Sequence, residues 1–152
     1  MDNKEITFIT GGASFLDEVK ELWEELNQIH FEKSVDFKNH YKAFTFATRK
    51  ESLVRHTENG KLLVVIACCN DQRIGYCISS VVDGIGEIDS IFVKSDYRKS
   101  DVGHKLMEIS LDWIRLNAAK KIIVKVSVGN EEVFGFYSKY GFAPRLTELQ
   151  IN

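Results

Sequence analysis

A short basic loop, followed by a helix-like stretch, is the first part of this sequence with residue types suited to ligand binding. Arg98 and Lys99 lie in the polar loop 94–100, which follows the apolar, strand-like segment 88–93. A helix is predicted after the loop because apolar residues recur at alternating steps of four and three; they are Val102, Leu106, Ile109, Trp113 and Leu116. A helix N-terminus presents free backbone N–H groups and a partial positive charge, and both favour an anion. The segment therefore predicts a phosphate-binding turn.

Two carboxylates precede this turn on the same predicted strand. Glu87 and Asp89 lie two residues apart, and side chains at this spacing share one face of a strand. Paired carboxylates attract a cation, and a carboxylate can accept a proton from an ammonium group. The alternative is that both are solvated residues at a strand end.

Two segments, YRKSDVGHKL and NEEVFGFYSKYGF, together resemble the GNAT family of N-acetyltransferases. YRKSDVGHKL resembles the family's acyl-CoA loop, Arg/Gln-x-x-Gly-x-Gly/Ala: Arg98 and Gly103 match, and Asp101 stands in place of the first glycine. NEEVFGFYSKYGF resembles the second motif, an Asn followed by a short helix with a Phe-Tyr pair and then Gly-Phe. The two motifs, in this order and separated by a strand, cover about residues 85–142.

The resemblance implies acetyl-CoA as the co-substrate. Arg98 and the backbone N–H groups of about residues 100–103 would hold the pyrophosphate, and the strand 91–93 would pair through its backbone with the pantetheine amides. A backbone N–H near Phe92 or Val93 would polarise the thioester. The residues assigned to the carrier are Ile91, Phe92, Val93, Arg98, Lys99, Ser100, Asp101, Val102, Gly103, His104, Asn130 and Tyr137. The alternative for the loop is an ordinary capped connection between a strand and a helix.

Asp101 is the departure from the family pattern. Aspartate tolerates a left-handed backbone, so the turn itself can be kept. Its carboxylate either lies beside the bound anion or turns away to cap the helix, where it would compete for N–H donors. We expect the loop to bind CoA, and the sequence does not predict how much Asp101 weakens this binding.

The resemblance also implies an acid and a base. Tyr137 would protonate the leaving thiolate, and Glu87 would deprotonate the amine, directly or through water. Asn130 would hydrogen-bond the carrier. Each has a structural alternative: aromatic packing for Tyr137, a solvated strand end for Glu87 and a helix cap for Asn130.

The acceptor site is implied beside the first two helices, with Phe31, Glu87 and Asp89 as the substrate candidates. Acidic and aromatic side chains in this region would suit a primary amine on a small molecule, a peptide N-terminus or a lysine. The same charges also fit the solvated faces of amphipathic helices. The sequence does not choose among these acceptors.

Composition excludes several other classes of protein. The 152 residues predict one domain, 1–152, with a net charge of −2 and no basic field for nucleic acid or an anionic membrane. No apolar run approaches the roughly 20 residues of a membrane span. MDNKEITFIT lacks the pattern of a signal peptide. We therefore expect a cytoplasmic protein without membrane or nucleic-acid partners.

No metal site is expected from the sequence. Three cysteines, Cys68, Cys69 and Cys77, lack the spacing of metal ligands or of a redox pair. Three of the four histidines lie in the predicted helical region without a second ligand at suitable spacing; they are His30, His40 and His56. The fourth, His104, begins the helix after the loop.

The order of elements predicts an α+β fold. The chain reads βααβββαβαβ, which favours a GNAT-like mixed, mostly antiparallel central sheet with helices on both faces. Ser14 is expected to cap the first helix, and the second helical region, 36–57, is expected to break near residues 45–48. Residues 121–128 and RLTELQI are the last two predicted strands.

We predict an N-acetyltransferase that uses direct attack of an amine on acetyl-CoA. One alternative keeps the fold without catalysis, as an acyl-CoA-binding or sensing module. Another is a protein-interaction domain that uses its aromatic-rich helices. A homodimer is compatible with all three.

Overall fold

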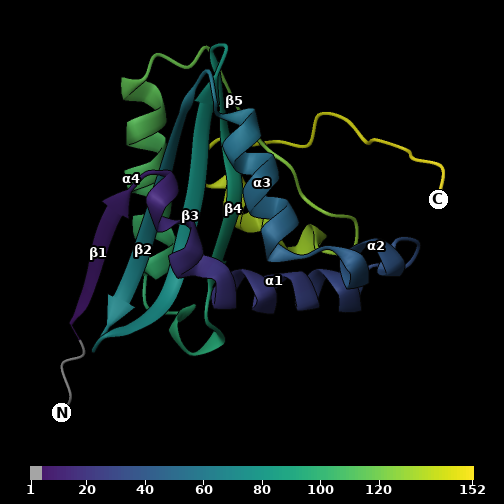
Figure 1. Ribbon diagram of the computed structural model, residues 1–152, viewed down its shortest axis with the longest axis horizontal. Helices are drawn as coiled ribbons and strands as arrows, with labels where there is room; N and C mark the ends of the chain where they lie inside the picture. Colours follow the sequence, from purple (N-terminus) through teal and green to yellow (C-terminus); the bar gives the residue numbers. More distant parts are fainter. Residues whose placement is uncertain (1–4) are drawn as a thin grey trace.

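The computed structural model describes residues 5–152 and contains one five-stranded sheet with helices on both faces (Figure 1). The strands lie in chain order, β1-β2-β3-β4-β5. Neighbouring strands from β1 to β4 are antiparallel, and only β4 and β5 are parallel. The predicted α+β architecture is confirmed. The strands are β1 Ile6–Gly11, β2 Lys61–Cys69, β3 Gln72–Val82, β4 Ile85–Val93 and β5 Lys121–Val124.

The helices divide between the two faces. The first group, before β2, comprises the 3₁₀ helix η1 Ala13–Val19 and the α-helices α1 Lys20–Lys33, α2 Lys38–Ala43 and α3 Phe46–His56. The later group comprises η2 Ser95–Tyr97, α4 Val102–Leu116, η3 Glu131–Val133 and α5 Phe134–Ser138. Figure 1 shows α1 and α3 on the near face of the sheet and α4 on the far face.

Each face of the sheet has its own apolar core. On the α4 face, Leu106, Met107 and Ile114 pack with strand residues such as Cys77 and Ile88. On the α1 and α3 face, the core side chains are Leu16, Val19, Leu22, Trp23, Phe46, Leu53, Val64, Ile66, Tyr76, Ile78 and Phe92. The continuous apolar runs of β2 and β3 follow from this arrangement, because both faces of these strands are buried.

The break in the second helical region is confirmed. The chain leaves α2 at Ala43 and starts α3 at Phe46. Thr45 is extended, and its hydroxyl accepts a hydrogen bond from the N–H of Thr48 at 3.2 Å, which caps α3. The predicted cap at Ser14 is wrong, because the chain there forms η1 and α1 begins only at Lys20.

The last predicted strand is also wrong. Residues 142–152 have no regular secondary structure, and β5 ends at Val124 instead of residue 128. Leu146, Leu149 and Ile151 are all exposed. A strand requires a partner for its backbone groups, and within residues 5–152 none pairs with this segment.

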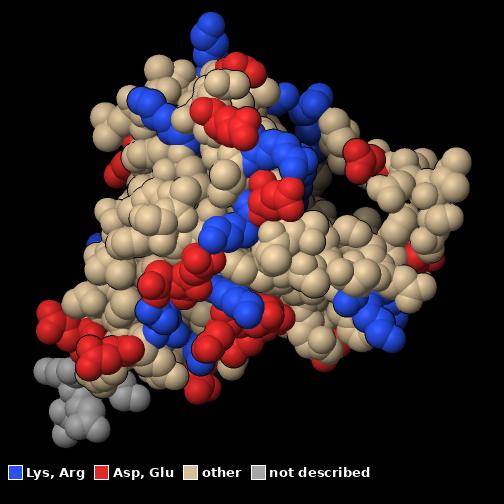
Figure 2. Space-filling model, in the orientation of Figure 1, with Lys and Arg blue, Asp and Glu red and all other residues tan. Residues whose placement is uncertain are grey.

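The surface carries mixed charge. Figure 2 shows acidic and basic side chains interspersed on one face of the molecule, without a field of a single sign. In the described part of the chain, no helix combines the length and apolar character needed to cross a bilayer.

Candidate active site

The site is built on β4, whose pairing changes halfway along its length. β4 pairs with β5 only from Ile85 to Ile88, and no described strand lies against that edge of β4 further on. On its other edge, Ile78 of β3 lies opposite Ser90 and Ser79 lies opposite Ile88, so Asp89 is an extra residue in β4. Such bulges are common beside active sites, where they redirect side chains and end pairing. The second half of β4 therefore has unpaired backbone groups along one edge.

The phosphate-binding turn follows directly from the end of β4. The N–H of Lys94 bonds to the carbonyl of Ile74 at 2.8 Å and holds the strand end against β3. Arg98 folds back over the same strand: its Nε donates to the carbonyl of Val93 at 2.9 Å, and its guanidinium lies 5.6 Å from the centroid of the Phe92 ring. Among the described residues no hydrogen bond is found for its two Nη groups, which are the ones that can bind an anion.

Asp101 has the left-handed backbone that its residue type predicts, with φ of 67°. Its side chain makes no capping hydrogen bond to α4, so the expected alternative of a helix cap is not observed. Only its carbonyl takes part in the helix, accepting from the N–H of Lys105 at 3.1 Å. The N–H groups of the first turn therefore keep the free state that every helix N-terminus has.

The remaining residues of the loop differ in their burial and contacts. Val102 is buried and can contribute only its backbone. The hydroxyl of Ser100 donates to the carbonyl of Tyr97 at 2.6 Å within the turn, and Lys99 is exposed. A Cβ on Gly103 would lie 3.5 Å from the ring of Phe136, so this glycine brings α4 close to α5.

His104 bonds to protein groups through both ring nitrogens. Nδ1 lies 2.8 Å from the hydroxyl of Tyr140, and Nε2 lies 2.7 Å from a carboxylate oxygen of Glu108. These contacts tie the imidazole to α4 and to the turn after α5.

Tyr137 is buried at the α4 face of the sheet, where the rings of Phe136 and Phe142 lie 5.3 and 5.9 Å from its own. Burial raises the pKa of Tyr137 above its usual value, and the nearby thiol of Cys77 adds to this shift. No hydrogen bond from its hydroxyl is found within residues 5–152. The phenol is thus kept protonated and available as a donor.

The side chain of Asn130 bonds to residues outside the phosphate-binding turn. Its Oδ1 accepts a hydrogen bond from the ammonium of Lys33 at 3.0 Å, and Lys33 also pairs with Glu132. The side chain makes no capping bond to η3, so the alternative role as a helix cap is not observed. The structure thus ties Asn130 to the end of α1.

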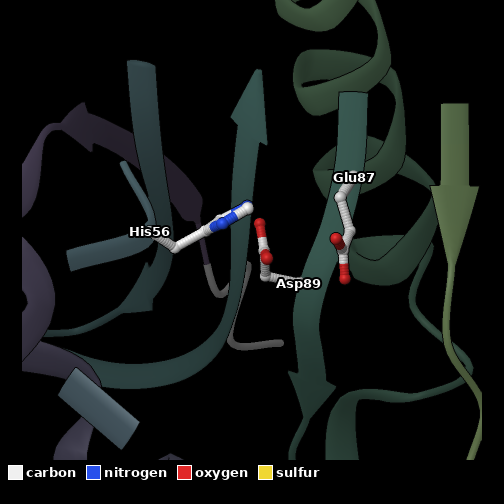
Figure 3. A group of neighbouring side chains, drawn as sticks. All are labelled: His56, Glu87 and Asp89. Atoms are coloured by element: carbon white, nitrogen blue, oxygen red, sulfur yellow. The ribbon is translucent and has the colours of Figure 1, made fainter. Parts of the chain in front are cut away.

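Glu87 and Asp89 lie together on β4, as their spacing predicts, and His56, the last residue of α3, lies beside them (Figure 3). One ligand atom each from His56, Glu87 and Asp89 lies within 4.8 Å of the others. Arg49, also from α3, donates from Nη2 to the backbone carbonyl of Asp89 at 2.9 Å. The pKa of Asp89 is raised to about 6, mainly by burial. The Ser80 hydroxyl, Arg49 and His56 lower it, and the neighbouring carboxylate of Glu87 raises it.

Phe31 lies near the connection between α1 and α2. The ammonium of Lys38 is 5.0 Å from the centroid of its ring and donates to the carbonyls of Phe31 and Glu32 at 2.8 and 3.0 Å. The Phe31 ring is therefore covered by a cation instead of lying free.

Arg49 and His56 are site residues that the sequence did not predict. Both come from α3 and reach β4 only through tertiary packing, so no local spacing connects them with Glu87 and Asp89. A separate surface hollow, lined in part by Asp17, Lys20 and Lys50, contains none of the candidate residues.

Comparison with known proteins agrees with this fold. The model of the acetyltransferase (GNAT) family matches residues 18–142. The chain therefore belongs to the GNAT family of acetyltransferases.

The individual relatives are distant. The uncharacterized N-acetyltransferase YobR of Bacillus subtilis is 29% identical over 65 residues, which are 43% of this chain and 26% of that protein. N-alpha-acetyltransferase 30 of Schizosaccharomyces pombe is 32% identical over 82 residues, 51% of this chain and 55% of that protein. The matched part thus spans only about a quarter to a half of these curated relatives.

A solved structure extends the agreement in fold to nearly the whole chain. The PaiA N-acetyltransferase of Thermoplasma acidophilum, in complex with coenzyme A, superposes with a TM-score of 0.74 at 17% identity, covering 95% of this chain and 93% of that one.

Proposed function

We propose that this protein is an acetyl-CoA-dependent N-acetyltransferase that acts on a primary amine. The observation that carries the proposal is the change in pairing along β4 and the turn that follows the strand. The strand loses its partner β5 after Ile88 and then leads, through the turn at Arg98, into the N-terminus of α4. A free strand edge suits the amide groups of a pantetheine arm, and a helix N-terminus at the end of the same strand suits its pyrophosphate.

The carrier would be held mainly by main-chain groups. The backbone of residues 91–93 supplies donors and acceptors along the free edge, and the N–H groups at the start of α4 supply the anion site. Arg98 adds charge beside them. Lys99 and Ser100 contribute to the same turn, and His104 and Asn130, whose polar atoms bond elsewhere, are assigned weaker roles.

The chemical step needs a base and an acid. Glu87 is proposed to take a proton from the ammonium of the acceptor, so that the neutral amine can attack the thioester carbon. Tyr137 is proposed to give its proton to the sulfur as the carbon–sulfur bond breaks. Glu87 lies beside the end of α3, whereas Tyr137 belongs to the core on the α4 side. This arrangement supports approach of acceptor and carrier from different sides of β4.

The acceptor is proposed to be a cationic primary amine, on a small molecule or on a peptide N-terminus or lysine. Glu87 and Asp89 provide the negative charge that would bind it. The name of the fission yeast relative, an N-alpha-acetyltransferase, supports including peptide N-termini among the amines tested.

Thermal unfolding with and without acetyl-CoA tests the carrier site. At a hundredfold excess over the dissociation constant, binding should stabilise the protein by about 2.7 kcal/mol. Arg98→Ala should lose much of this shift, and Arg115→Ala, an exposed arginine near the end of α4, should retain it. Release of free thiol on a panel of amines then tests transfer.

The second candidate is the same fold as a non-catalytic acyl-CoA-binding module. Asp101 favours it, because its carboxylate lies beside the proposed anion site. Binding of acetyl-CoA without thiol release on any amine would select this candidate, and absence of any acetyl-CoA shift would reject both.

A further inference from the structure

We infer that His56, Glu87 and Asp89 form a binding site for a divalent transition-metal cation such as Zn²⁺, which excludes the acceptor amine when it is bound. The inference concerns residues that the fold, and not the local sequence, brings together. Its binding part stands on the geometry alone. Its inhibitory part rests on the proposed function, in which the same carboxylates receive the amine.

The donor set fits such a cation. One imidazole nitrogen and two carboxylate oxygens lie within 4.8 Å of one another. Figure 3 shows the imidazole of His56 facing the carboxylate of Asp89, with the carboxylate of Glu87 beside them. Three protein ligands of this kind, with a fourth position left to water, are typical of open zinc sites. Ligand atoms at about 2.1 Å from zinc lie roughly 3.4 Å apart in a tetrahedral site. The cluster must therefore contract by up to about 1.4 Å from the 4.8 Å limit, which rotation of the exposed His56 and the flexible Glu87 side chain allows.

Buried polar atoms around the cluster lack partners. Oδ2 of Asp89 and the hydroxyl of Ser80 are buried, and neither has a hydrogen bond of regular geometry, although the Ser80 hydroxyl is close enough to lower the pKa of Asp89. Ser80 is fully buried and lies opposite Glu87 in the pairing of β3 with β4. Unsatisfied buried polar atoms are rare because each costs free energy. A cation would satisfy the Asp89 oxygen, and the Ser80 hydroxyl could then orient the carboxylates from behind.

The local field also favours a cation. His56 is the last residue of α3, so the partial negative charge of that helix end lies beside the cluster. Two carboxylates add to it. Arg49 opposes them, although its guanidinium is bonded to the carbonyl of Asp89. We therefore expect weaker affinity than that of a structural zinc site with four protein ligands.

Binding is tested on the full chain, first freed of metal with a chelator and then titrated with Zn²⁺ in the absence of acetyl-CoA and amine. Calorimetry should find one equivalent, and the melting temperature should rise. His56→Ala should weaken binding about tenfold or more. His40→Ala, an exposed histidine on α2, is the matched control and should bind as the wild type does. Asp89→Asn should also weaken binding.

Cobalt identifies the ligands independently. The absorption spectrum of the Co²⁺ complex should show nitrogen and oxygen ligands and lack thiolate charge-transfer bands. Such bands would instead indicate Cys68, which is partly exposed. The site is overturned by absence of stoichiometric Zn²⁺ binding, by equal binding in His56→Ala, or by a thiolate spectrum.

Activity measurements then separate this inference from the proposed function. Zn²⁺ should inhibit acetyl transfer competitively with the amine in the wild type, and the inhibition should be lost in His56→Ala. Inhibition that is not relieved by excess amine would contradict the inhibitory part. Stoichiometric Zn²⁺ binding by a protein with no transferase activity would support the metal site and reject only the proposed function.

Discussion

The imidazole of His104 lies 2.8 Å from the hydroxyl of Tyr140, and the two rings stack with centroids 5.8 Å apart. This contact joins the first turn of α4 to the residues immediately after α5. The proposed anion site and the helix that carries Tyr137 are thereby fixed relative to each other, with the contact between Gly103 and Phe136 as a second connection.

Loss of this connection should loosen α5. His104→Ala is expected to lower the free energy of unfolding by about 1 kcal/mol, the usual value for one hydrogen bond. Hydrogen exchange of the amides in residues 136–142 should become faster. Lys105→Ala changes an exposed neighbour and is the control. Unchanged exchange in His104→Ala would show that the contact does not hold α5.

Tyr137→Phe should separate chemistry from packing. The ring stays in the core while the proton donor is lost, so kcat should fall by about 10²-fold or more with a small change in melting temperature. Tyr140→Phe removes a phenol three residues further on and should have a much smaller effect on kcat. Equal activity of wild type and Tyr137→Phe would remove Tyr137 from the mechanism.

The loss of folding stability at acidic pH should depend in part on His30. Burial lowers the pKa of His30, and Lys33 lowers it further. Below about pH 6.5 the unfolded chain therefore binds the proton more readily than the folded chain, and stability is lost as the pH falls through the lowered folded pKa. Urea unfolding at pH 7.5 and 5.5 should show a smaller loss in His30→Asn than in the wild type. Parallel losses in the two proteins would contradict this assignment.

Any side chain at position 86 should lower the stability of the protein. A Cβ there would lie 2.3 Å from a methyl carbon of Ile114 and 3.2 Å from the Cβ of Ala119, in the part of β4 that pairs with β5. Gly86→Ala is expected to destabilise the protein by about 1–3 kcal/mol because the core must shift. Gly135→Ala, where the added carbon meets no atom within 4 Å, is the control. Chemical denaturation of both variants measures the difference, and equal stabilities would contradict the packing.

Residue type and local spacing predicted several structural features of the candidate site. The left-handed turn at Asp101 follows from its residue type, and the shared position of Glu87 and Asp89 follows from the two-residue period of a strand. The burial of Tyr137 agrees with its aromatic neighbours.

Long-range contacts account for the site residues that the sequence did not predict and for the predicted strand that did not form. Arg49 and His56 reach β4 only because α3 packs on the sheet, and Lys33 holds Asn130 across most of the chain length. The predicted strand after Phe142 failed for a related reason, since alternating residues form a strand only where a partner edge receives them.

Asp101→Gly tests the departure from the family pattern. Position 101 has φ of 67° and ψ of 8°, which glycine adopts without strain, so the turn should be kept. The substitution removes a negative charge at the helix N-terminus, where an anion is proposed to bind. Such a charge is worth about 0.3–1 kcal/mol, so calorimetry should show CoA binding tighter by about twofold to fivefold.

Asp101→Asn separates charge from backbone freedom. Asparagine also tolerates the left-handed conformation, and the substitution removes the carboxylate without adding flexibility. If repulsion is the cause, both variants should bind CoA more tightly than the wild type, and the difference should shrink at high salt because screening weakens it. Weaker binding in both variants would mean that the Asp101 carboxylate contributes to the carrier site, since neither glycine nor asparagine prevents the turn from forming.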